Sequence, residues 1–414
     1  MLDRKTFNPA VLAIISEAFL SRLSFGVLMF ALPLYARALG MTLAEIAVLI
    51  TANTMISMLL KPYIGRLADW LGYKRGAIVA IAVRSALTVL FALTSGAWQL
   101  FALQTARGAA KALRDPSMEA LIAEHGGRRT IASAFAWYKT ATSAAGALGK
   151  ALAGALLTLT ASNFLPVFVV AFLFSVLPLL VVSRYVPATT SPAMPAEDAA
   201  APASSTGIDE GRMIDPKLWP AIGFGFLVSA TAQMLRSLFP VLAVEYGGLS
   251  EAETGVLYLV ATIVVLVAGP IFGWLVDNVS RKLVLMTRSV ANIASSAIYL
   301  AFPSFPGFVA GKAVDEAGKA AFHPAWGSLM ADLSNHDRAR RGRVMGPLGA
   351  AVDAGSIAGP IVAGLLWTVW GIGALLAARI ALAILTEVYA WWILTRATAQ
   401  TSDVTHSSPQ ASST

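Results

Sequence analysis

Charged side chains recur at helical spacing inside two otherwise apolar stretches of the chain. The first set is Arg107, Lys111 and Arg114, and the second is Lys312, Glu316 and Lys319. Spacings of three and four residues place the members of each set on one face of a helix. Such a face can bind an anion or form ion pairs with a neighbouring helix. These residues therefore predict either the binding of an anion or ion pairing between helices.

The elements that carry these charges must cross a membrane. The 414 residues are 57% hydrophobic and only 13% charged, whereas soluble domains carry about 25% charged residues. Apolar runs of about twenty residues, each long enough to span a bilayer, recur along the chain. We therefore expect an all-α polytopic membrane protein in contact with the lipid bilayer.

The sequence lacks the residues that several classes of chemistry require. The absence of Cys excludes disulfides, thiol catalysis and Cys-ligated metals. No phosphate-binding loop, metalloprotease motif or nucleophile elbow is present. We expect no cofactor, no metal and no enzymatic activity.

The apolar runs number twelve, six on each side of an Ala-, Pro-, Ser- and Thr-rich segment. We expect a six-helix bundle at 1–186, a flexible cytoplasmic linker at 187–216, a second six-helix bundle at 217–396 and a disordered tail at 397–414.

The distribution of basic residues predicts the orientation. With a cytoplasmic N-terminus, the inside loops and termini hold 18 of the 31 Lys and Arg residues, Arg288 among them, and the outside loops hold only Arg37. Both termini are therefore expected in the cytoplasm. Topology also explains the net charge of +8 without nucleic acid as a partner. We expect the inner membrane of the cell, with an internal prokaryotic membrane as the alternative.

The two halves repeat one another after a shift of 208 residues. Pro62 then matches Pro270, and Lys111 matches Lys319. Because each half has an even number of spans, both enter the membrane from the same side. Parallel repeats of this kind commonly enclose a central binding site.

The loop after the second span carries a motif, "GRLADWLGYKR", and the loop after the eighth carries its copy, "GWLVDNVSRK". Both resemble the loop signature of the major facilitator superfamily, whose fold is twelve transmembrane helices in two pseudo-symmetric bundles. By this resemblance the two loops latch the cytoplasmic side of an alternating-access transporter. The expected gating residues are Gly65, Asp69, Gly72, Lys74, Arg75, Gly273, Asp277, Arg281 and Lys282.

The resemblance also implies that spans 1, 4, 7 and 10 line the cavity, with spans 2, 5, 8 and 11 beside them. Ionisable residues inside spans are functional candidates, and here they fall mainly on those spans. The expected cavity residues are Arg22, Arg107, Lys111, Lys139, Lys150, Arg236, Lys312 and Lys319. The candidates for proton coupling are Glu17, Asp315, Glu316 and Asp353. This excess of positive charge favours an anionic or zwitterionic solute.

Alternatives remain open for these residues and for the protein. Lys–Glu and Arg–Asp pairs also act as structural ties between helices. Lys150 stands where antiporters of the superfamily often carry proline, so the direction of transport is not fixed. We expect a monomeric, proton-coupled secondary transporter. The alternatives are an exporter of drugs or amphiphiles and a transport-inactive sensor or assembly protein.

Overall fold

A computed structural model describes residues 9–125, 131–187, 218–279, 281–335 and 341–406, apart from some side chains near the ends of these stretches. Most of the predicted linker, 187–216, lies outside them. The described residues are almost entirely helical, and no strand occurs among them. Helices suit a span in lipid because they satisfy their own backbone hydrogen bonds.

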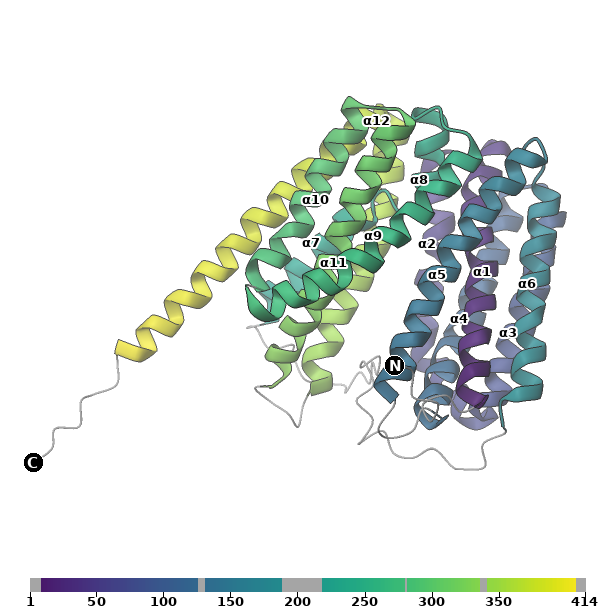
Figure 1. The fold of residues 1–414 in the computed structure, drawn as a ribbon, viewed down its shortest axis with the longest axis horizontal. Coiled ribbons are helices and arrows are strands. Elements are labelled where there is room, and N and C mark those ends of the chain that lie inside the picture. The colour runs from purple at the N-terminus through teal and green to yellow at the C-terminus, as the bar shows by residue number, and fades with distance from the viewer. Residues whose placement is uncertain (1–8, 126–130, 188–217, 280, 336–340, 407–414) are drawn as a thin grey trace, which may run out of the picture.

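The first six helices form one bundle, drawn in purple to blue in Figure 1. They are α1 (Pro9–Ala38), α2 (Leu43–Leu71), α3 (Tyr73–Leu90), α4 (Ala97–His125), α5 (Ile131–Leu159) and α6 (Phe164–Tyr185). Within this N-terminal bundle, α1 packs against α5 and α6, and α4 packs against α2 and α3.

The remaining helices form the C-terminal bundle, drawn in green to yellow. They are α7 (Trp219–Gln233), α8 (Phe239–Val241), α9 (Glu251–Asn278), α10 (Arg281–Ala301), α11 (Phe305–Asn335) and α12 (Arg341–His406). α7, α8 and the π-helix Leu242–Tyr246 together make one broken span. α12 comprises two helices that meet at Gly371, whose φ of 82° breaks the helix. Twelve spans in two six-helix bundles result, as predicted; α12 itself continues to His406, into the predicted tail.

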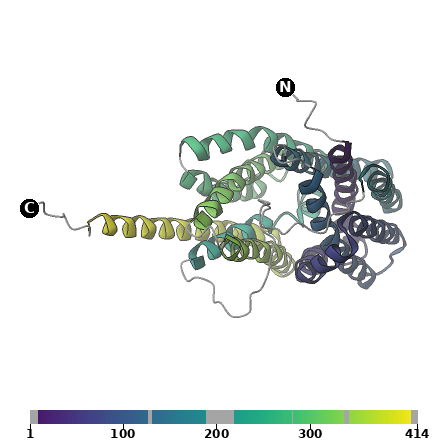
Figure 2. The same ribbon diagram turned by 90° about the horizontal axis from the view of Figure 1, so that it is seen from below.

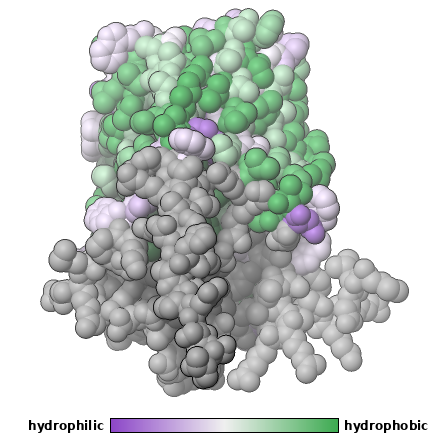
Figure 3. All heavy atoms as spheres, turned by 90° about the vertical axis from the view of Figure 1, so that its left-hand side faces the viewer, coloured by the Kyte–Doolittle hydropathy of each residue, from purple (hydrophilic) through white to green (hydrophobic). Residues whose placement is uncertain are grey.

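Eight helical segments are long and apolar enough to cross a membrane on composition alone. The other spans are α7, which is short, and α4 and α11, which carry the two charged sets. Large apolar side chains on α9 are exposed, including Leu266 and Trp274. The coloured part of the face in Figure 3 is mostly hydrophobic, as expected for a surface in contact with lipid.

The two ends of α1 define the two sides of the molecule, which we call the Pro9 side and the Arg37 side. On the Arg37 side, α5 packs against α9 and α2 packs against α12, so the two bundles are in contact. One apolar cluster there joins both bundles, with Phe30 and Leu157 from the first and Phe239 and Tyr258 from the second. Figure 2 shows the two bundles side by side from below.

On the Pro9 side each bundle has an apolar cluster of its own. The N-terminal one contains Ile14 and Met118, and the C-terminal one contains Val228 and Trp326. Because the shared cluster lies on the Arg37 side and the separate clusters on the Pro9 side, the described residues close the bundles together on the Arg37 side and not on the other.

The closed side repeats its contacts in both halves. Thr158 of α5 accepts a hydrogen bond from the backbone N–H of Ala252 in α9, at 3.0 Å. Thr368 of α12 accepts one from Ala44 of α2 in the same way, at 3.1 Å. Ala44 and Ala252 are 208 residues apart, so the internal repeat of the sequence is also a repeat of the interface.

One assignment from the sequence is wrong. Arg288 does not lie in a loop but within α10, where its side chain is buried. It donates to the backbone oxygen of Asp315 at 2.7 Å and pairs with the Asp315 carboxylate at 3.3 Å. A buried acid on α11 therefore explains a basic residue that the sequence alone places near a turn.

Candidate functional site: a charged cavity between the bundles

A cavity of about 660 Å³ lies between the two bundles. It is lined by α1, α2, α4 and α5 from the N-terminal bundle and by the broken α7–α8 span, α9, α11 and α12 from the other. We call it the central cavity. Its charged lining residues are Arg22, Lys111, Lys150, Arg236, Lys312, Lys319, Glu316 and Asp353. Six basic side chains thus face two acidic ones.

Helix packing brings Arg22 and Lys150 to this cavity. A Cβ on Gly149 would collide with the backbone oxygen of Leu23, so only glycine allows α5 to approach α1 this closely. A Cβ on Gly26 of α1 would likewise overlap the backbone oxygen of Gly146, one turn earlier in α5. The glycines of α5 are therefore spacers that place two cations side by side.

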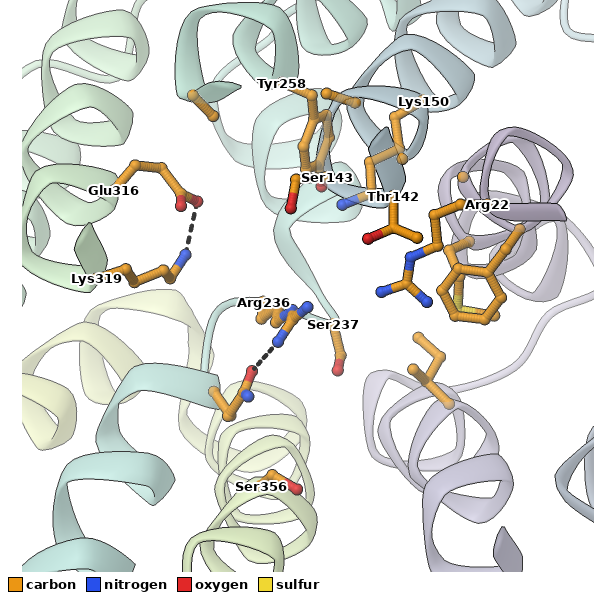
Figure 4. A pocket seen from close by; sticks show the side chains of 18 of the residues that line it. Arg22, Thr142, Ser143, Lys150, Arg236, Ser237, Tyr258, Glu316, Lys319 and Ser356 are labelled. Carbon is orange, nitrogen blue, oxygen red and sulfur yellow. Dashed lines mark hydrogen bonds and ion pairs between the residues drawn. The ribbon is translucent and has the colours of Figure 1, made fainter. Parts of the chain in front are cut away.

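Three basic groups point toward the middle of the cavity and have no carboxylate partner in the part of the chain that the structure describes. The Arg22 guanidinium lies 4.6 Å from the ring centre of Phe25, and the Lys150 ammonium lies 4.0 Å from that of Tyr258. Arg236 lies in the break between α7 and α8 and bonds only the Gln233 amide oxygen, at 3.4 Å. None of the three has an acid within ion-pair distance among the residues that the structure describes. Figure 4 shows them converging from both bundles.

The cations of α11 are instead neutralised. The Glu316 carboxylate pairs with Lys312 at 3.0 Å and with Lys319 at 2.6 Å. Lys312 also lies 5.0 Å from the ring centre of Tyr258. Tyr258 therefore contacts a lysine of each bundle, Lys150 and Lys312, and these cation–π contacts stabilise both ammonium groups away from bulk water.

The four candidate acids lie in different settings. Glu17 is fully buried, accepts from Ser21 at 2.6 Å and pairs with Arg114 at 2.8 Å, so it ties α1 to α4. Asp315 is also buried, and Glu316 and Asp353 line the central cavity. Asp353 has no cation within ion-pair distance among the described residues.

The buried network around Asp315 lies inside the C-terminal bundle. Arg379 donates to Asp315 at 2.6 Å, and Lys319 pairs with it at 2.9 Å. Arg379 also donates to Asn292 and to Ser295 and Ser296. These bonds tie α10, α11 and α12 together. Asp315 itself does not line the cavity.

Two of the predicted cavity residues differ from the other six. Arg107 does not line the central cavity but a smaller pocket of about 370 Å³ beside it, within the N-terminal bundle. We call this the side pocket. The side chain of Lys139 lies outside the described residues.

The predicted gating motif is only partly described. Gly72 adopts a φ of 80° between α2 and α3, a conformation that disfavours any residue with a side chain. Lys74 donates to the backbone oxygen of Ser183 at 3.1 Å, and Arg75 is exposed. Gly273 lies within α9 with open space around it. Gly65 and the side chains of Asp69, Asp277, Arg281 and Lys282 lie outside the description.

Sequence reasoning missed Tyr258 and the partner of Arg37. Tyr258 is one of three aromatic residues in an apolar span, and nothing in the sequence distinguishes it from a core residue. The sequence identifies Arg37 only as the outside cation, but its guanidinium pairs with Glu245 of the other bundle at 2.6 Å. Both residues flank the closed side of the cavity.

A polar, charged cavity enclosed by two six-helix bundles defines a multi-pass membrane transporter. The chain belongs to the Major Facilitator Superfamily, whose sequence profile matches residues 17–247 and 221–412.

Two curated relatives match shorter segments. A "Staphyloferrin B transporter" from Staphylococcus aureus is 27% identical over 156 residues, which is 36% of each chain. An "MFS-type transporter" from Claviceps purpurea is 26% identical over 144 residues, which is 34% of this chain and 24% of the relative. The chain thus matches only about a quarter to a third of the length of these two proteins.

Solved structures share the fold over almost the whole chain. The nucleoside transporter NupG superposes with a TM-score of 0.74 at 15% identity, over 94% of this chain and 99% of its own. A bacterial homologue of the human lysosomal transporter Spinster, inward-facing and occupied, gives 0.71 at 14% identity, over 94% and 98%. The human organic anion transporter MFSD10 gives 0.62 at 17% identity, over 92% and 99%. At these identities the likeness establishes the fold alone.

Proposed function

We propose that the protein is a secondary active transporter that moves a small anionic or zwitterionic solute by alternating access, with coupling to protons. The observation that carries the proposal is the set of three converging cations, Arg22, Lys150 and Arg236, that have no carboxylate partner among the described residues. Arg22 and Lys150 are half-buried and Arg236 is exposed in the cavity. A solute that displaces water from these side chains must compensate their charge, because an unpaired buried charge is costly. An anionic solute supplies that compensation.

Alternating access is supported by the asymmetry of the interface. The bundles share one apolar cluster on the Arg37 side and have separate clusters on the Pro9 side. In this arrangement the solute enters or leaves on the Pro9 side. Rocking of the two bundles about the cavity would open the Arg37 side and close the other.

We place the protein in the inner membrane as a monomer, with both termini in the cytoplasm. The Pro9 side is then cytoplasmic and the arrangement is inward-facing. The motif around Gly65, Asp69 and Gly72 and its copy around Asp277 would latch the cytoplasmic side when it closes. Two bundles, 1–186 and 217–396, joined by the linker at 187–216, provide the moving parts.

Proton coupling is assigned to Asp353. Glu17 and Asp315 are held by buried ion pairs, and Glu316 by two lysines, so protonating any of these would break existing bonds. Asp353 lines the cavity and can take up a proton without losing a partner among the described residues.

A thermal-shift screen of the purified chain tests the charge of the solute. Ligands that bind the folded state raise the unfolding midpoint with concentration. We expect hits among carboxylates and phosphorylated compounds, and loss of these hits in Lys150→Met. Hits confined to lipophilic cations would instead favour an exporter of drugs or amphiphiles. Silence across anions, cations and neutral solutes would favour a sensor or assembly protein.

A further inference from the structure

The side pocket lies beside the central cavity, within the N-terminal bundle. Arg22 and Lys111 line both spaces, so the two are adjacent. Three further guanidinium groups, those of Arg84, Arg107 and Arg114, line only the side pocket. The carboxylates of Asp115 and Glu119 line it as well, so five basic side chains face two acidic ones there. A charged group bound in the central cavity could therefore extend a second group into this pocket.

Two of the three guanidinium groups are compensated by the protein. Arg114 pairs with Glu17 at 2.8 Å and with Asp115 at 3.1 Å. Arg84 donates to the Ser21 hydroxyl at 2.6 Å, and that hydroxyl in turn donates to Glu17. The Glu17 carboxylate thus balances the charge of Arg114 directly and that of Arg84 through the Ser21 hydroxyl.

Arg107 is not compensated in this way. It is only 3% exposed, yet its bonding partner is the neutral hydroxyl of Thr88, at 2.7 Å. Its guanidinium lies 5.6 Å from the ring centre of Phe91. No carboxylate lies within ion-pair distance of it among the residues that the structure describes. A buried cation in a pocket wall, with spare donors and no carboxylate within ion-pair distance among the described residues, is suited to bind an anion.

The other bundle shows what a compensated version of this position looks like. Asp315 is 208 residues after Arg107 and so occupies the equivalent place in the repeat. There the charge is balanced by Arg288, Arg379 and Lys319 of the same bundle. The N-terminal bundle has a cation at this place, and no carboxylate pairs with it among the residues that the structure describes.

We propose that the side pocket binds a second anionic group of the transported solute. The solute is then a small dianion or polyanion, such as a dicarboxylate. One anionic group lies with Lys150 and Arg236 in the central cavity, and the other reaches Arg107, with Lys111 and Arg22 between them. This inference rests on the proposed transport of an anion and extends it to the number of charged groups.

The test compares ligands that carry one carboxylate with ligands that carry two. The full chain, in lipid nanodiscs, is titrated calorimetrically with butyrate and with the dicarboxylates succinate, glutarate and adipate. We expect the best dicarboxylate to bind at least about tenfold more tightly than butyrate, because charge-assisted hydrogen bonds are the stronger ones. Arg107→Met should reduce this advantage to less than about twofold while the chain still binds butyrate. Lys150→Met should weaken both kinds of ligand.

Butyrate binding also reports whether the Arg107→Met chain is folded. If that variant binds nothing, Arg107→Lys replaces it, since lysine keeps the charge but loses the paired donors. It should retain butyrate binding and lose only part of the preference for dicarboxylates.

An unchanged preference for dicarboxylates in the Arg107 variants would overturn the inference while leaving anion transport intact. A separate inorganic anion in the pocket would overturn it as well. In that case phosphate would bind the wild type through Arg107 without competing with the dicarboxylates. Failure of the wild type to bind any anion would overturn the proposed function itself.

Discussion

Arg37 and Glu245 occupy equivalent positions of the two repeats and pair with one another across the bundle interface. They are 208 residues apart, which is the repeat length, and the Arg37 Nε lies 2.6 Å from the Glu245 carboxylate. Two equivalent positions can meet only close to the pseudo-symmetry axis. The pair therefore marks the point where the two bundles converge on the closed side of the cavity.

Breaking this pair is expected to loosen the closed side. Its side chains are 43% and 34% exposed, and a pair this exposed contributes only about 0.2–1 kcal/mol. Arg37→Glu should therefore raise access to the cavity from the Arg37 side by no more than about tenfold, allowing for the new repulsion. The double exchange Arg37→Glu with Glu245→Arg should restore the original access.

The chain offers a clean measurement of that access because it contains no Cys. Met29 lines the cavity on α1, so the rate at which Met29→Cys reacts with a membrane-impermeant maleimide applied on the Arg37 side reports opening of that side. Equal rates in wild-type and Arg37→Glu backgrounds would show that the pair does not hold the bundles closed.

The glycines at the interface are expected to matter more than the ion pair. A Cβ on Gly154 would overlap the backbone oxygen of Glu251, and one on Gly364 would lie 2.7 Å from that of Leu43. Overpacking of this kind costs about 1–3 kcal/mol. Gly154→Val and Gly364→Val should each raise maleimide labelling of Met29→Cys by about 5- to 100-fold. Gly349→Val is the matched control, because open space surrounds that glycine of α12; labelling that rose as much there would contradict a specific role for the interface.

The Glu17–Arg114 pair is expected to stabilise the N-terminal bundle rather than to carry solute. Removing one member of a buried ion pair costs about 3–5 kcal/mol, since it leaves the other charge uncompensated. Glu17→Gln should lower the unfolding midpoint, followed by tryptophan fluorescence, far more than Arg37→Gln does. The double variant Glu17→Gln with Arg114→Gln should be less damaged than Glu17→Gln alone. An unchanged midpoint in Glu17→Gln would contradict the structural role.

The assignment of the proton to Asp353 predicts a separation of two activities. In proteoliposomes, Asp353→Asn should still exchange solute across the membrane. Its rate of uptake driven by a pH gradient should fall at least about tenfold. Glu316→Gln is the comparison variant: it leaves Lys312 and Lys319 without their shared carboxylate. That variant should have a changed affinity for the solute but keep its response to the pH gradient. If Asp353→Asn responded to the gradient as the wild type does, the proton would have to be carried elsewhere.

Much of the fold could be predicted from local features of the sequence. The lengths of the apolar runs gave the spans, and the spacing of 208 residues between Lys111 and Lys319 gave the two bundles. The same spacing recurs in the capping boxes of α2 and α9, where Thr42 and Ser250 each bond the residue three positions on. Helix periodicity and capping are local properties, so a sequence displays them directly.

The pairing of charges was beyond the reach of the sequence. Arg288 lies close to a turn in the chain, and only the packing of α10 against α11 brings it to Asp315. Arg107 and Lys111 are one turn apart on α4, yet one faces the side pocket and the other lines both spaces. Helical spacing shows which residues lie on the same face of a helix. The packing of the neighbouring helix decides which partner that face contacts.

Transport by the purified chain in proteoliposomes tests the proposed function most directly. A gradient of a dicarboxylate should drive a transient charge movement on a solid-supported membrane. The signal should saturate with concentration and disappear in Lys150→Met, while the Gly349→Val control retains it. Saturable transport of cationic or neutral solutes alone, undiminished in Lys150→Met, would contradict an anion site at the three converging cations.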